Sequence, residues 1–124
     1  MTSKQSILAA ATNQKNLDLL TQVLEKEGYP VLAAGSLEAI DSVLSENSGV
    51  GLALLDLAGF DRRIWERCEQ MRNVQIPFLL ISAKQSTAIR RETITHGAQG
   101  LLVKPLVIKE LLGLVAGFME EQHE

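Results

Sequence analysis

Four apolar runs of the chain end on residues of different chemical type. The run GLALLDL reaches Asp56, FLLIS ends on Ser82, and GLLVKPL carries Lys104. An acid, a hydroxyl and an amine could together form one charged site if the fold brings these run ends to one place. The run ILAAATN has the same form, but it ends on Ala11 and Thr12, which bring no charge.

The elements that must position these residues alternate regularly along the chain. Strand-like apolar runs occur at residues 6–12, 30–34, 50–55, 77–82 and 100–103. Each is followed by apolar residues at helical spacing, at 13–28, 36–47, 61–72, 86–96 and 106–119. Repeated strand–helix units imply a parallel sheet with helices on both faces and right-handed crossovers. We predict a flavodoxin-like (βα)5 doubly wound α/β fold with strand order 2-1-3-4-5, whose carboxyl strand ends share one crevice.

Length and composition indicate a single domain, residues 1–124, with a core at about 5–119. Apolar residues make up 46% of the chain, and the net charge of −3 gives no general attraction to nucleic acid or anionic lipid. The single cysteine, Cys68, excludes an intramolecular disulfide and fits a reducing compartment. The start has no secretory signal pattern, and no run approaches the roughly 20 apolar residues that span a bilayer. We therefore expect a cytoplasmic protein without direct nucleic-acid or membrane contacts.

The order of these features resembles the receiver domain of two-component response regulators. The resemblance covers almost the whole chain, and it is strongest in HGAQGLLVKPL and in the apolar frame of ILAAATNQKNLDLL. It places Asp56 at the family's phosphoacceptor position, Ser82 at its switch hydroxyl and Lys104 at its conserved lysine. It also implies a signalling module rather than an enzyme, and a cis bond between Lys104 and Pro105.

The chain departs from the resembled family where the family binds Mg²⁺. Two acidic residues usually end the first strand there, whereas Ala11 and Thr12 stand at these positions. The loop LAGFD is short and lacks the family's proline, and Leu101 replaces the aromatic residue that moves with the switch hydroxyl. Mg²⁺ prefers about six oxygen ligands, usually including one or two carboxylates. With Asp56 as the only carboxylate, we expect a standing ion pair with Lys104 and no metal or other cofactor.

Three functions follow from these observations. The first is an atypical receiver that signals by protein–protein contact, independently of aspartyl phosphorylation. The second is a conventional receiver that is phosphorylated on Asp56 by a histidine kinase with weakly held Mg²⁺. The third is a flavodoxin-like module that binds a small ligand in the crevice, where Ala9, Ala10, Ala11 and Ala34 leave room.

We expect this chain to act through a histidine kinase or a separate output protein, or through a longer parent protein of which it is a part. The tail EEQHE is too short to form an output domain, and we expect a monomer or a weak homodimer. In the resembled family, the fourth helix, fifth strand and fifth helix commonly form the contact face. Here that face contains Arg90, Arg91, Thr95, Lys109 and Glu110.

Other side chains near these elements have competing interpretations. Asp61 can be a relocated acidic ligand or the cap of the third helix. Trp65 can contact a partner beside Arg62 and Arg63, or it can pack within the domain. His96 stands at a helix end, where a cationic or polar group suits the helix dipole.

Overall fold

The computed structural model describes residues 5–46, 49–84 and 86–120, in which strands and helices alternate. The strands are β1 (Ser6–Ala10), β2 (Val31–Ala34), β3 (Val50–Asp56), β4 (Phe78–Ser82) and β5 (Gly100–Val103). The helices are α1 (Gln14–Lys26), α2 (Leu37–Glu46), α3 (Ile64–Asn73), α4 (Thr87–Thr95) and α5 (Ile108–Glu120). All strand pairs are parallel, in the order β2-β1-β3-β4-β5. The predicted flavodoxin-like topology is confirmed.

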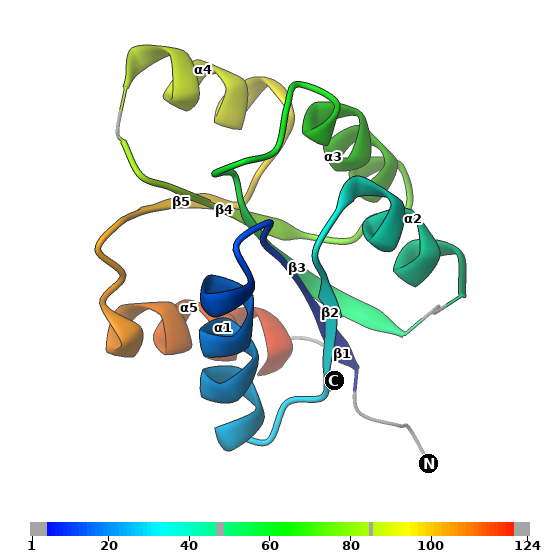
Figure 1. Cartoon of the computed structure of the whole chain (residues 1–124), viewed down its shortest axis with the longest axis vertical. Helices are drawn as coiled ribbons and strands as arrows, with labels where there is room; N and C mark the ends of the chain where they lie inside the picture. The colour runs from blue at the N-terminus through cyan, green and yellow to red at the C-terminus, as the bar shows by residue number, and fades with distance from the viewer. Residues whose placement is uncertain (1–4, 47–48, 85, 121–124) are drawn as a thin grey trace.

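The sheet lies between two layers of helices. Figure 1 shows α1 and α5 together on one face, and α2, α3 and α4 on the other. Successive side chains of a strand point to opposite faces, so a central strand must be apolar at every position. In β3, Leu52 and Leu54 pack with α1 and α5, whereas Ala53 and Leu55 pack with α2 and α3. This alternation explains why the run GLALLDL has no polar residue before Asp56.

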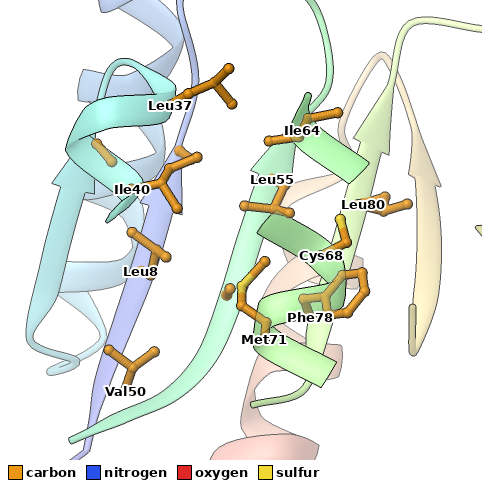
Figure 2. Packing of buried hydrophobic residues seen from close by; sticks show 13 residues of the cluster. Leu8, Leu37, Ile40, Val50, Leu55, Ile64, Cys68, Met71, Phe78 and Leu80 are labelled. Atoms are coloured by element: carbon orange, nitrogen blue, oxygen red, sulfur yellow. The ribbon is translucent and has the colours of Figure 1, made fainter. Parts of the chain in front are cut away.

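The core on the α2–α3 face is built around β3 and β4. Figure 2 shows Leu55 of β3 between Leu8 and the side chains of α3, with Phe78 against the lower turns of that helix. Cys68 lies in the same cluster and is 0% exposed. Burial raises the pKa of its thiol to about 12. Cys68 is therefore an apolar packing residue with a protonated thiol.

Two helices differ from their predicted form. The third helix was expected over residues 61–72, but α3 begins at Ile64 because residues 61–63 form a turn in which Asp61 accepts a hydrogen bond from the Arg63 N–H. In α5, the apolar spacing of the sequence suggests that Leu114 points inward with Leu111 and Val115, but Leu114 is 39% exposed. The buried stripe of α5 is Leu111, Val115 and Met119, with a strict spacing of four residues.

Two sequence predictions fall on residues that the structure does not describe. Asn47, where the second helix was expected to end, lies outside the described residues, as does most of the tail EEQHE. Within the described chain, every helix falls short of the length and hydropathy that crossing a bilayer requires.

Candidate functional site

Asp56 is held at the carboxyl edge of the sheet by the register of three strands. It pairs with Ile81 of β4, and the neighbouring Ser82 pairs with Val103 of β5, so Lys104 follows directly beyond the sheet. The Lys104 N–H donates to the Ser82 carbonyl at 2.9 Å, which continues the β4–β5 ladder past the end of β5. The three chemically distinctive run ends are therefore neighbours, as the predicted strand order required.

Both carboxylate oxygens of Asp56 are engaged. Its Oδ2 lies 2.8 Å from the Lys104 ammonium nitrogen, and its Oδ1 accepts a hydrogen bond from the Ala58 N–H at 3.2 Å. The Asp56 side chain is 3% exposed and that of Lys104 is 27% exposed. A buried carboxylate needs such compensation, because an unpaired charge in a dry environment is strongly unfavourable. The predicted ion pair is present, and the Lys104–Pro105 bond is cis as expected.

The end of β1 contributes a hydroxyl instead of a charge. Thr12 is exposed, and its Oγ1 donates a hydrogen bond to the Ala58 carbonyl at 2.9 Å. Ala11 is 1% exposed and packs with Ala9 and Leu17. Thr12 thus fastens the end of β1 to the loop that follows Asp56, across 46 residues of sequence.

This set of donors differs from the one that Mg²⁺ prefers. The metal requires several oxygens free to coordinate, including one or two carboxylates. Asp56 is already paired with Lys104, and the Ala58 carbonyl already accepts from Thr12. Within residues 5–46, 49–84 and 86–120, His, Cys, Asp and Glu side chains form no group of three or more that could hold a metal ion. The donors at this edge therefore depart from the set of free carboxylate oxygens that Mg²⁺ prefers.

The hydroxyl of Ser82, at the end of β4, is engaged in local hydrogen bonds. Ser82 is 6% exposed. Its Oγ donates to the Lys84 carbonyl at 2.8 Å and accepts from the Lys84 N–H at 3.2 Å. Leu101 is partly buried against the α2–α3 core cluster. The hydroxyl of Ser82 therefore closes a turn of its own loop.

Asp61 acts neither as the cap of α3 nor as a free acid. Its carboxylate pairs with the Arg63 guanidinium at 2.8 Å, and this bond holds the pKa of Asp61 at about 2. Arg63 occupies the cap position of α3, and its side chain makes no capping bond. The capping prediction was wrong in this respect, because the Asp61 side chain bonds two residues ahead, within the preceding turn.

A cluster of polar side chains between α3 and α4 was not predicted from the sequence. His96 ends α4, as predicted. Its Nδ1 lies 2.8 Å from Glu69 Oε2, and its Nε2 lies 3.0 Å from Glu92 Oε2. Trp65 stacks on this ring, with centroids 4.9 Å apart and planes at 9°. Only the Glu92–His96 spacing of four residues was a visible signal.

The predicted contact face flanks β5, which is one of the two edge strands of the sheet. Arg90, Arg91 and Thr95 lie on α4, and Lys109 and Glu110 lie in the first turn of α5. All five side chains are exposed. Ile94, which the sequence analysis did not include, is 79% exposed on the same helix. Ile94 is thus a single exposed apolar side chain beside the cations of α4.

The four alanines that were expected to leave room for a ligand do not do so. Ala9 and Ala10 are 0% exposed, and Ala11 and Ala34 are 1% exposed. They belong to the core, where their small size lets α1 and α2 approach the sheet. That expectation was wrong, because small residues on a covered strand were mistaken for the wall of an open crevice.

The loop after Asp56 depends on Gly59, which has a φ of +85°. A Cβ at this position would collide with the Thr12 side chain, coming within 3.1 Å of its Cβ and closer still to its Oγ1. We expect Gly59→Ala to lower the free energy of unfolding by about 3 kcal/mol, from φ strain and this collision together. In a Thr12→Ala background the loss should fall to roughly half.

Urea unfolding followed by circular dichroism measures both values. Gly49→Ala is the matched control, because a Cβ at Gly49 meets nothing within 4 Å. Equal losses in the two backgrounds would mean that Thr12 does not define this loop.

Comparisons with known proteins agree with this geometry. Residues 7–116 match the family model described as "Response regulator receiver domain". The transcriptional regulatory protein HprR of Escherichia coli strain K12 is 30% identical over 128 aligned residues, covering 94% of this chain and 52% of HprR. The response regulator ArlR of Staphylococcus saprophyticus is 29% identical, covering 95% of this chain and 54% of ArlR. The chain spans about half the length of these curated relatives.

Solved structures give the same fold. A CheY-like response regulator receiver domain protein from Methanospirillum hungatei JF-1 superposes with a TM-score of 0.85 at 25% identity, covering 97% of both chains. A two-component response regulator from Clostridium difficile has a TM-score of 0.86 at 21% identity, covering 97% of this chain and 99% of the other. At that identity, the second likeness concerns the fold alone.

Proposed function

We propose that this chain, which belongs to the family of response regulator receiver domains, signals by contact with a protein partner and without Mg²⁺-dependent phosphorylation of Asp56. Receiver domains are signalling modules of two-component systems. The partner of this chain is a histidine kinase or a separate output protein, and no nucleic acid or membrane takes part directly.

The observation that carries the proposal is the state of the Asp56 carboxylate. One oxygen pairs with Lys104 at 2.8 Å, and the other accepts from Ala58. Phosphoryl transfer brings an anionic phosphoryl group against this anionic carboxylate, and catalysis consists mainly of positioning and charge neutralisation. A divalent metal supplies much of that neutralisation. With Ala11 and Thr12 at the end of β1, this chain lacks the carboxylates that would bring the metal there.

The second part of the proposal is a single dominant conformation. A ligand shifts an equilibrium between two states only by its differential affinity for them. Ser82 is bonded within its own loop, and Leu101 has no ring that could follow its movement. Phosphorylation at Asp56 and the conformational change that would pass from Ser82 to β5 are therefore both weakened. Regulation then depends on how much partner is present or on another site.

A conventional phosphoacceptor role is the second candidate. Asp56 at the end of β3, Ser82 at the end of β4 and Lys104 beyond β5 have the arrangement that this role requires. Relatives of this chain carry the names of response regulators and transcriptional regulators. In that case Asp56 would take a phosphoryl group from a histidine kinase, with weakly bound Mg²⁺.

Affinity capture from the native cell extract separates the two candidates. We expect Asp56→Asn to bind the same proteins as the unaltered chain, because the amide preserves the shape of the site and can still accept a hydrogen bond from Lys104. Arg91→Glu combined with Lys109→Glu should lose these proteins, since both exposed cations belong to the contact face. Quantitative mass spectrometry of the captured proteins gives the comparison.

The thermal unfolding midpoint of each variant serves as the control for folding. If Asp56→Asn lost its partners while its midpoint stayed unchanged, the conventional phosphoacceptor role would be favoured instead.

A further inference from the structure

A cavity opens beside the Asp56–Lys104 pair, between α1 and the segment that leads from β5 into α5. Its volume is about 320 Å³. Figure 1 shows this segment returning alongside α1 on the carboxyl side of the sheet. Leu19, Leu20 and Val23 line it from α1, and Leu106 and Ile108 line it from the opposite side. The volume lies within the range of about 300–1,000 Å³ that is typical of small-molecule sites.

The walls of this cavity are apolar and partly open to solvent. Leu20 is 4% exposed, but Leu19 is 54% exposed and Ile108 is 36% exposed. Exposed leucine and isoleucine side chains on two facing segments gain free energy when an apolar body covers them both. The wall residues therefore favour a ligand whose body is hydrocarbon.

The polar end of the cavity carries no net charge, because its acid and its amine form an ion pair. Asp56, Lys104 and the neutral Asn16 line it, and the two charged side chains neutralise each other at 2.8 Å. A charged ligand would bring an unpaired charge into an apolar space, which is strongly unfavourable. An ammonium group has three N–H donors, and Asp56 engages one of them. The site can therefore offer hydrogen-bond donors to an uncharged acceptor.

From these features we infer that the cavity binds a small uncharged amphiphile with an apolar body and one carbonyl oxygen. The carbonyl accepts a hydrogen bond from Lys104, and the body lies between Leu19 and Ile108. This binding is an activity separate from partner contact. It would join α1 to the start of α5 while leaving the Asp56–Lys104 pair intact.

The test uses four probes of similar shape on the whole chain, followed by methyl NMR. Acetophenone has the carbonyl, ethylbenzene lacks an acceptor, benzoate is an anion and benzylammonium is a cation. We expect acetophenone to shift the methyl signals of Leu19, Leu20 and Val23 in a saturable manner. Ethylbenzene should bind about fivefold more weakly, which corresponds to one ordinary hydrogen bond. Each charged probe should bind at least about tenfold more weakly than acetophenone.

A variant pair on α1 locates the site. Val23→Phe fills the cavity and should abolish the saturable shifts. Gln22→Phe adds the same ring at an exposed neighbouring position and should leave them unchanged. Thermal unfolding of both variants shows whether they remain folded.

Several results would overturn the inference. They are shifts that do not saturate, shifts of equal size at the exposed Val74 and Ile94, and binding of ethylbenzene as tight as that of acetophenone. Tighter binding of benzoate would also overturn it, because the site would then take an anion at Lys104. Retained binding by a folded Val23→Phe chain would place the ligand elsewhere.

Discussion

Replacing Lys104 by methionine is expected to lower the free energy of unfolding by about 3 kcal/mol. The substitution leaves Asp56, whose side chain is 3% exposed, without its counter-charge. Removing one partner of a buried ion pair typically destabilises a protein by about 3–5 kcal/mol. The lower end applies here, because the Ala58 N–H still bonds the carboxylate and Lys104 itself is 27% exposed. Urea unfolding followed by Trp65 fluorescence and circular dichroism measures the loss.

A double-mutant cycle assigns this loss to the pair. In an Asp56→Asn background the carboxylate charge is absent, so Lys104→Met should lower stability by only about 1 kcal/mol. The difference between the two backgrounds is the interaction between the side chains. A loss from Lys104→Met that was equally small in both backgrounds would show that the pair does not stabilise the fold.

The combined substitution Ala11→Asp and Thr12→Asp is expected to create a stabilising response to Mg²⁺, whereas we expect no such response from the unaltered chain. It adds two carboxylates at the end of β1, and it frees the Ala58 carbonyl from the Thr12 hydroxyl. Three carboxylates and a carbonyl then match the ligand preference of the metal. At ten times the dissociation constant, binding stabilises the folded state by about 1.4 kcal/mol. The melting temperature should then rise by roughly 5 °C for a domain of this size.

Two further variants make this result interpretable. Ala11→Asn with Thr12→Asn changes shape similarly without adding charge, and it should show no response to Mg²⁺. Thr12→Asp alone alters only an exposed residue, so it tests one added acid even if the buried Ala11→Asp substitution impairs folding. If the doubly acidic chain folded but its melting temperature did not change on addition of Mg²⁺, the absence of acidic residues at positions 11 and 12 would not be what limits metal binding.

The fold was predictable because its determinants are periodic. Apolar runs that end on Asp56, Ser82 and Lys104, each followed by helical spacing, leave few topologies to consider. The errors arose where a local side-chain hydrogen bond sets the start of a helix, or where the exact rotation of a helix sets which side chains are buried. A turn closed by Asp61 delays the start of α3, and the spacing of Leu111, Val115 and Met119 turns Leu114 outward.

The site was predictable only in the part that strand ends determine. Asp56 and Lys104 each follow a strand, so the parallel sheet brings them together and the ion pair could be expected. The bond from Thr12 to the Ala58 carbonyl spans 46 residues, and that from His96 to Glu69 spans 27. No pattern in a single sequence predicts such pairs, because each depends on how two loops or two helices pack against each other.

The most direct test of phosphorylation-independent signalling is a backbone NMR comparison of the chain with and without a beryllofluoride phosphoryl mimic and Mg²⁺. The proposed function predicts unchanged signals at Asp56 and across the contact face, because the carboxylate is occupied by Lys104 and the metal lacks its ligands. Large changes spreading from Asp56 to Arg90, Arg91 and Lys109 would contradict it and would show that the phosphorylation switch operates.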